Sequence, residues 1–195
     1  GTAAGTVMLK DIRPGSLSSS ASQLMHWKGV IYFTANDGTN GSELWVTDGT
    51  VAGTFMRLDI NPGSNSSSPA YFTPMNGKLY FRANNGTTGT ELWVTDGTVA
   101  GTALVADLNP GTNSSSPVNL TACNGKLVFA ATSGSGTEPH VSDGTAVGTM
   151  MLKDVYPGTS GSFPSDFTCS GDYVYFDAND GTQNTGTGRE LWRTD

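Results

Sequence analysis

Apolar residues along this chain come in short runs that are rich in aromatic and branched side chains, and each run is bounded by Gly, Asn, Asp or Pro. In one stretch these runs predict four strands, at residues 70–75, 78–82, 91–95 and 103–107. Many short strands separated by turns are typical of an all-β protein. The glycine count of 26 agrees with such a turn-rich chain.

Two kinds of tight turn recur between the predicted strands. Asn76-Gly77 and Asn124-Gly125 predict two-residue hairpin turns, because both positions of such a turn need positive φ, and Gly171-Asp172 is expected to act in the same way. The recurring Asp-Gly-Thr predicts a second reversal, in which the aspartate accepts backbone N–H bonds and the glycine takes the left-handed conformation. These aspartates are Asp48, Asp96 and Asp143.

A longer pattern organises the whole chain. Residues 41–54 read GSELWVTDGTVAGT, and the pattern returns at residues 91–102, in weakened form at 138–149 and cut short at 190–195. The missing half of the last copy stands at residues 1–6. The repeats are therefore residues 1–48, 49–96, 97–143 and 144–195, and a period of about 40–50 residues is typical of propeller blades.

This arrangement predicts a single domain over residues 1–195, a β-propeller of four four-stranded blades. Residues 6–12 would supply the outermost strand of the last blade, whose other three strands would come from residues 165–194. Ring closure is favoured because an unpaired edge strand invites association, and we expect a monomeric ring. Half of an eight-bladed ring built from two chains, and an arc of a longer array, are the alternatives.

Composition excludes some classes of function. The net charge is -7, and the ten basic residues are scattered, so nucleic acid is not expected as a partner. No apolar run approaches the ~20 residues that span a bilayer, so membrane insertion is not expected either. Since the first residues continue a repeat, we expect the chain to be cut from a longer or processed precursor.

Two cysteines, Cys123 and Cys169, occupy similar positions in the third and fourth repeats. The favoured interpretation is two buried small apolar residues, and one disulfide between neighbouring repeats is the alternative.

Two families of longer loops are expected to share one face, because alternate connections of a meander lie at the same end. Polar residues on this face are the candidate ligand contacts for a glycan or a protein partner. For the aspartate that ends each outermost strand, the alternative to ligand binding is a structural role, in which its side chain accepts hydrogen bonds from loop amides. Trp27 is expected to be exposed, whereas Trp45, Trp93 and Trp192 are expected in the core. The candidate ligand residues are Asp11, Asp59, Asp107, Asp154, Asn65, Ser66, Asn113, Ser114 and Trp27.

Calcium needs six to eight oxygen ligands. The first repeat offers Asp37 and Glu43, and the fourth offers Asp180 and Glu190, as a partial set. The favoured alternative for the recurring glutamates Glu43, Glu91, Glu138 and Glu190 is that they accept unpaired amides of the neighbouring long loop.

The sequence offers few candidate catalytic residues. His26 and His140 are the only histidines, and neither lies near a recognisable Ser or Cys nucleophile motif. The recurring carboxylates leave a paired-carboxylate hydrolase open, but repetition in every blade argues against an active site. We therefore expect a protein that is not an enzyme.

Glu43-Leu-Trp-Val-Thr-Asp-Gly-Thr50 and its copies resemble the ELWxxDGT repeat family of secreted and surface-associated bacterial proteins. The third copy departs at the Leu-Trp pair, where Pro139 and His140 stand. The resemblance implies export to the cell surface or medium as part of a larger secreted protein, with no reaction attached. We expect a binding or structural module for adhesion or scaffolding. The alternatives are a lectin-like propeller that binds calcium or glycan, and an accessory domain of a secreted hydrolase.

Overall fold

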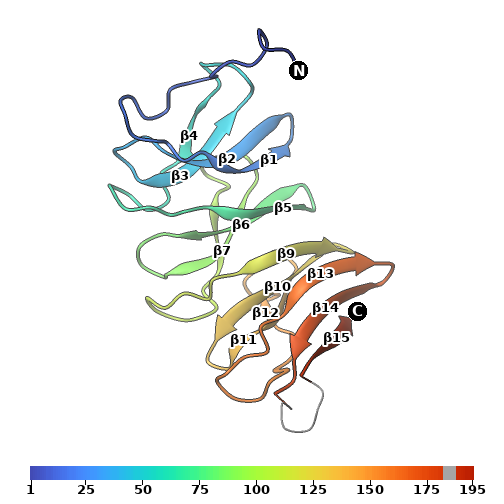
Figure 1. Ribbon diagram of the computed structural model, residues 1–195. Coiled ribbons are helices and arrows are strands. Elements are labelled where there is room, and N and C mark those ends of the chain that lie inside the picture. Colours follow the sequence, from blue (N-terminus) through green and yellow to red (C-terminus); the bar gives the residue numbers. More distant parts are fainter. Residues whose placement is uncertain (182–187) are drawn as a thin grey trace. The chain divides into compact units, whose positions relative to one another are not determined.

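The computed structural model describes residues 1–181 and 188–195 (Figure 1). The described residues form an all-β protein with fifteen strands and no helix. None of them forms a helix that is long and apolar enough to cross a membrane. The prediction of an all-β fold is confirmed.

The chain divides into two compact units, Gly1–Ala70 and Tyr71–Asp195. The first unit holds one antiparallel sheet in the order β1-β2-β3-β4, a meander in which each strand pairs with the next along the chain. Its strands are β1 (Ser22–Trp27), β2 (Val30–Asn36), β3 (Ser42–Thr47) and β4 (Phe55–Leu58). The assignment of both units to one domain stays a prediction.

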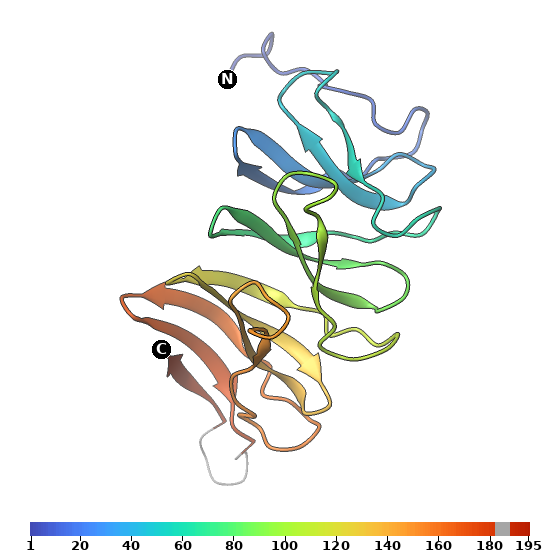
Figure 2. The same ribbon diagram turned by 180° about the vertical axis from the view of Figure 1, so that it is seen from behind.

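The second unit holds three antiparallel meanders, each formed by consecutive strands (Figure 2). One contains β5 (Ala70–Met75), β6 (Lys78–Asn84), β7 (Thr90–Thr95) and β8 (Ala103–Ala106). The next contains β9 (Val118–Cys123), β10 (Lys126–Ser133), β11 (Gly136–Ser142) and β12 (Met150–Met151). The last has three strands, β13 (Ser165–Ser170), β14 (Tyr173–Asn179) and β15 (Arg189–Thr194).

The four strands predicted between residues 70 and 107 are confirmed as β5 to β8, within two residues at each end. The two Asn-Gly hairpin turns have the predicted positive φ at both positions. Asn76 and Gly77 have φ of 49° and 73°, and Asn124 and Gly125 have φ of 48° and 76°. At the third predicted turn Gly171 alone has positive φ among the described pair, so its geometry differs.

The second strand of each sheet supplies the centre of the core. A phenylalanine and, two residues later, an alanine are buried at the same position of every sheet: Phe33 and Ala35, Phe81 and Ala83, Phe129 and Ala131, Phe176 and Ala178. Within the second unit these strands pack sheet against sheet in two clusters, one around Phe129 and one around Phe176. Trp45 and Trp93 are buried as expected, and Trp192 is partly buried against the second cluster.

Cys123 and Cys169 form a disulfide between β9 and β13. The favoured interpretation of two separate apolar residues was therefore wrong, and the alternative is correct. The two residues had matched repeat positions on first strands of neighbouring sheets. That placement lets side chains 46 residues apart in sequence meet, with 5.5 Å between their Cα atoms.

The predicted closure is not confirmed. Residues 165–170, 173–179 and 189–194 form the three expected strands of the last sheet, but residues 6–12 form no strand. The last sheet therefore lacks the outermost strand that the other three sheets possess.

Candidate functional site

The recurring glutamate of the third strand is a buried side chain that accepts several hydrogen bonds from one loop. Glu43 on β3 has no exposed surface. Its Oε2 accepts a hydrogen bond from the Ile60 amide at 2.8 Å, and its Oε1 accepts one from the Ser67 amide at 2.7 Å. The Ser67 hydroxyl also donates to Oε2. One carboxylate therefore fastens both ends of the loop that leaves the outermost strand.

The same three bonds recur in the next two sheets. Glu91 accepts the amides of Leu108 and Ser115 and the hydroxyl of Ser115. Glu138 accepts the amides of Val155 and Ser162 and the hydroxyl of Ser162. In each repeat the partners lie 17 and 24 residues after the glutamate. We call this set of three bonds the glutamate latch.

The latch places a carboxylate away from water. Burial raises the pKa of Glu43 and of Glu91, the hydrogen bonds from Ser67 and Ser115 oppose that rise, and the nearby charges of Asp59 and Asp107 add to it. The favoured expectation, that these glutamates accept hydrogen bonds from loop amides, is confirmed at Glu43, Glu91 and Glu138. The calcium role of Glu43 stays a prediction.

The serine before the latch serine holds the second long loop. Ser66 Oγ accepts the Ser42 amide, and Ser114 Oγ accepts the Thr90 amide, each at 2.9 Å. Backbone bonds between the same loops run from the Ser68 amide to the Ser42 carbonyl. The two loop families therefore meet on one face, as predicted.

A glycine makes this loop contact possible. A Cβ atom at Gly41 or Gly89 would overlap the carbonyl of Asn65 or Asn113, and both glycines have φ of 73°. The asparagine side chains themselves are exposed. Of the predicted ligand residues, Ser66 and Ser114 thus carry structural bonds, while Asn65 and Asn113 face solvent.

The predicted aspartates at the strand ends are half-buried at three positions and exposed at Asp11. Asp59 Oδ2 accepts the Gly63 amide at 3.4 Å, and Asp107 Oδ2 accepts the Gly111 amide at 3.3 Å. The Oδ1 atoms of Asp59, Asp107 and Asp154 are buried and accept no hydrogen bond from the described residues. These bonds agree with the loop-acceptor alternative, and a ligand role stays a prediction.

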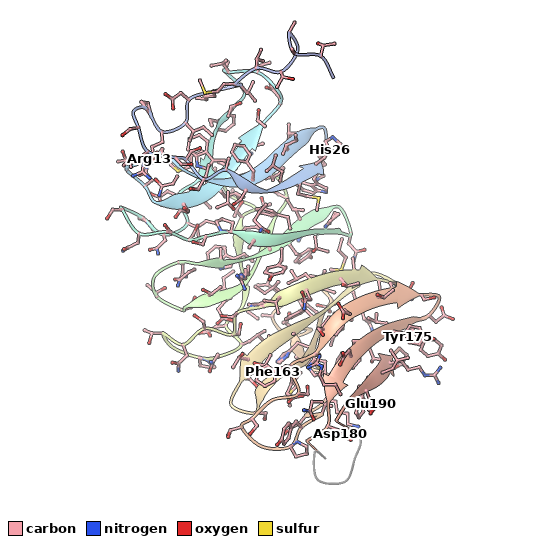
Figure 3. All side chains as sticks on the ribbon, viewed as in Figure 1. Arg13, His26, Phe163, Tyr175, Asp180 and Glu190 are labelled. Carbon is pink, nitrogen blue, oxygen red and sulfur yellow. A yellow bond between two sulfur atoms is a disulfide. The ribbon has the colours of Figure 1, made fainter. Side chains whose placement is uncertain are left out.

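The calcium candidate Asp37 accepts hydrogen bonds from its own loop. Asp37 Oδ1 accepts the amides of Thr39 and Asn40. Slight burial works against ionisation there, but these bonds lower the pKa of Asp37 overall. Asp180 and Glu190 flank the stretch that contains residues 182–187, which lie outside the described residues (Figure 3). Across residues 1–181 and 188–195, no group of three His, Cys, Asp or Glu side chains could hold a metal ion.

Trp27 corrects one expectation. Its side chain is buried, with 9% of its surface exposed, rather than presented to solvent. The ring packs at 5.6 Å from the Tyr32 ring, and the Lys28 ammonium covers it at 4.3 Å. The hairpin turn at Lys28-Gly29 brings Trp27, Lys28 and Tyr32 together. The sequence showed only that Trp27 lies beside a turn, and not that its neighbours would cover it.

The two histidines lie in different surroundings, His140 buried and His26 exposed. His140 is buried on β11 and stacks on Phe129 at 5.9 Å, the place that Trp45 takes beside Phe33. Burial lowers the pKa of His140, and its Nδ1 lies 2.9 Å from the Glu138 carbonyl oxygen. His26 lies on β1 in the other unit (Figure 3). His140 therefore fills the tryptophan position of the weakened repeat.

The predicted Asp-Gly-Thr turn is present in all three full copies. Asp48, Asp96 and Asp143 each accept the amide and the hydroxyl of the threonine two residues later. These hydrogen bonds lower the pKa of Asp48 and Asp143, whose carboxylates are exposed.

The last sheet differs from the other three at every latch position. Glu190 is exposed, and its carboxylate accepts no hydrogen bond from the described residues. Its backbone pairs with β14. Leu191 is 76% exposed, whereas its counterparts Leu44 and Leu92 are fully buried. A Cβ at Gly188 would meet nothing within 4 Å. Within the described residues of Tyr71–Asp195, no loop covers these positions.

Sequence reasoning missed the latch serines Ser67, Ser115 and Ser162. The signal was present, because a serine stands 24 residues after the glutamate in each of these repeats. The Ser-Ser-Ser runs suggested ligand contacts, and nothing local distinguished the buried hydroxyl from its exposed neighbours.

Known proteins resemble this chain in fold only. No family model matches it, and no curated protein matches it. A crystal structure of a puromycin hydrolase mutant complexed with PGG is 16% identical over 85% of this chain and 25% of that chain, with a TM-score of 0.56. A structure from a study of two prolyl endopeptidases is 15% identical over 85% and 25%, with a TM-score of 0.50.

The chain thus spans about a quarter of the length of these two proteins. At such low identity the likeness shows the fold alone, which is an all-β, propeller-like fold of antiparallel sheets.

Proposed function

We propose that the chain is a non-enzymatic, extracellular structural repeat module with a role in scaffolding or adhesion. The observation that carries the proposal is the glutamate latch. Glu43, Glu91 and Glu138 are the recurring carboxylates that a hydrolase would need, and each accepts loop amides at both of its carboxylate oxygens. A carboxylate that is inaccessible and fully engaged serves the framework rather than a substrate.

Two further features support export. The Cys123–Cys169 disulfide favours an oxidising compartment, such as the space outside the cell. The resemblance to the ELWxxDGT repeats points to secreted bacterial proteins, in which this module would be one part of a larger chain.

The finer architecture that we propose is a closed, four-bladed ring. Residues 6–12 would complete the last sheet as its fourth strand, so that no sheet edge remains unpaired. An eight-bladed ring from two chains and an arc of a longer array are the competing arrangements.

A binding and turnover screen tests the function. The protein would be incubated with polysaccharides and peptides, with and without millimolar calcium, while calorimetry measures binding and chromatography measures products. We expect neither products nor saturable binding. The matched variant is Asn65→Ala with Asn113→Ala, because both side chains face solvent beside the latched loops.

The outcome decides between the module types. Glycan binding that disappears in the double asparagine variant, while its melting temperature is unchanged, would replace the structural role by a lectin-like one. Calcium-dependent stabilisation of several degrees would establish a metal site, since binding to the folded state raises stability as RT ln(1 + [L]/Kd). Reproducible bond cleavage would end the non-enzymatic proposal.

A further inference from the structure

We infer that a cavity between the third and the last sheet binds a small aromatic carboxylate. The cavity has a volume of about 270 Å³, and β11, residues 152–155, β14 and β15 line it. All of these residues belong to the unit Tyr71–Asp195. The inference goes beyond the structural role proposed above and depends on neither ring closure nor export.

The cavity lies where the third repeat departs from the motif. Leu44 and Leu92 follow the recurring glutamate and are fully buried, whereas Pro139 stands at this position on β11. A proline ring closes back onto its own backbone nitrogen, so it reaches less far from the strand than a leucine side chain does. Pro139 lines the cavity, and the volume that a leucine would fill is left open beside it.

The same proline shortens the outermost strand of the third sheet. The equivalent leucines of the first two sheets pair across to that strand, Leu44 with Leu58 and Leu92 with Ala106. The pairing of β11 with β12 ends before Pro139, which has no amide hydrogen to donate. Lys153 stands at the position of Leu58 and Ala106, and it is therefore outside the strand, exposed at the edge of the cavity.

The walls of the cavity suit a flat apolar group. Phe176 is buried on β14, and Leu152 and Val155 pack in the same core cluster. Trp192 on β15 is partly buried, and its Nε1 donates to the Ala178 carbonyl at 3.1 Å, which fixes the plane of the indole ring. An apolar cavity of about 150 Å³ is large enough to bind benzene. The larger cavity here has room for a six-membered ring with a short side chain.

One positive charge lies over these walls. Lys153 Nζ is 5.1 Å from the centre of the Trp192 ring, and it forms no hydrogen bond or ion pair within the described residues. Lys10, at the same repeat position in the first unit, instead donates to the carbonyls of Val51 and Thr54. A charge-assisted hydrogen bond to a carboxylate is stronger than an exposed cation–π contact. The Lys153 ammonium can therefore leave the ring face for the carboxylate of a ligand.

The other cation at the cavity does not point into it. Arg193 borders the cavity from β15, but its guanidinium carbon lies 4.4 Å from the centre of the Tyr173 ring. Successive side chains of a strand point to opposite faces, so Arg193 points away from the face that carries Trp192. One ammonium above apolar, aromatic walls selects a small aromatic carboxylate. A sugar would need more polar groups, and a phosphate would need more charge.

Titration with 3-phenylpropionate tests the site. The neutral amide, 3-phenylpropionamide, has nearly the same size and shape and lacks the charge. Calorimetry in 0.15 M salt, which screens the net charge of -7 beyond about 8 Å, should give a Kd of about 1 mM or lower for the carboxylate. The amide should bind at least about tenfold more weakly. The indole N–H signal of Trp192 should shift in the NMR spectrum when the carboxylate binds.

Two variants separate the charge from the space. Lys153→Met keeps a side chain of similar length without the ammonium, so it should weaken carboxylate binding by about tenfold and leave amide binding unchanged. Pro139→Leu restores the residue of the first two repeats and should abolish binding of both probes by filling the cavity. The matched control, Lys126→Met, removes an exposed lysine of β10 outside the cavity and should change neither affinity.

Three results would each overturn the inference. They are the absence of saturable 3-phenylpropionate binding, equal affinity for the carboxylate and the amide, and unchanged binding in a folded Pro139→Leu protein. Melting curves establish folding, and Lys153→Met decides the matter if Pro139→Leu does not fold, because Lys153 is exposed. None of these measurements involves a polysaccharide or bond cleavage, so a failure here is distinct from a failure of the structural role.

Discussion

The third and fourth sheets have similar repeat sequences, but only the third has an outermost strand. On β11, Glu138 is fully buried and holds Val155 and Ser162. On β15, Glu190 occupies the same repeat position and is exposed. Because the strand and its hairpin form in both sheets, the latch is not needed for the sheet to form locally. It is needed to fix the loop that follows the outermost strand.

The comparison also shows why this glutamate is buried only where its loop covers it. A carboxylate removed from water costs free energy unless its hydrogen bonds are satisfied. The latch satisfies it with three donors and in return satisfies two loop amides that would otherwise be unpaired. The glutamate and the loop are therefore stable only as a pair, which is why both are present or both are incomplete.

Breaking a complete latch should give the largest effect. Glu91→Ala leaves the part-buried amide of Leu108 and the buried amide of Ser115 without an acceptor, and an unsatisfied buried group costs about 1–3 kcal/mol. We expect the free energy of unfolding of Tyr71–Asp195 to fall by about 3 kcal/mol or more, measured by urea denaturation. Glu190→Ala is the matched control and should cost clearly less, because the Glu190 side chain is exposed and no loop amide of the described residues depends on it. Equal losses would contradict the comparison.

The residues that could be predicted from sequence are those with local signals. Asn76-Gly77 specifies its turn through the φ angles of two neighbouring residues, and the strand from residue 70 to 75 carries its own apolar pattern. The repeat identified Glu43 as an acceptor for loop amides because an unpaired loop needs one. These inferences needed no knowledge of distant contacts.

The remaining features depend on residues far apart in sequence. Ser67 is buried because it faces Glu43, 24 residues away, and its neighbours Ser66 and Ser68 are exposed. Trp27 is covered by residues across its hairpin, and Cys123 meets a partner 46 residues later. Identical residue types in one run receive different environments, so composition alone could not separate them.

Filling the loop contact should give an intermediate effect. Gly89→Ala puts a methyl group against the Asn113 carbonyl and adds left-handed backbone strain of about 1–2 kcal/mol. With the displaced loop, we expect a loss of about 2–4 kcal/mol in the free energy of unfolding. Gly188→Ala has a similar φ of 68° but an open neighbourhood, so it should show little beyond the strain. A larger loss in Gly188→Ala than in Gly89→Ala would reverse the comparison.

The smallest expected effect is the pH dependence of the latch. Burial raises the pKa of Glu91, partly offset by hydrogen bonds from Ser115 and Leu108 and reinforced by the Asp107 charge. The folded protein then binds a proton at this carboxyl more readily than the unfolded chain does. The resulting stabilisation is complete below the unfolded pKa of about 4.3 and is lost as pH rises through the higher folded pKa.

Glu91→Gln isolates this contribution, since glutamine does not titrate. The free energy of unfolding of the unmodified protein, minus that of Glu91→Gln, should decrease as pH rises from 4 to 7. Urea denaturation at four pH values measures it, and repetition in high salt is the control. Salt screens the Asp107 charge more than it changes burial, so the slope should persist there. A difference that grows with rising pH would mean that the three hydrogen bonds outweigh burial and favour the ionised carboxylate.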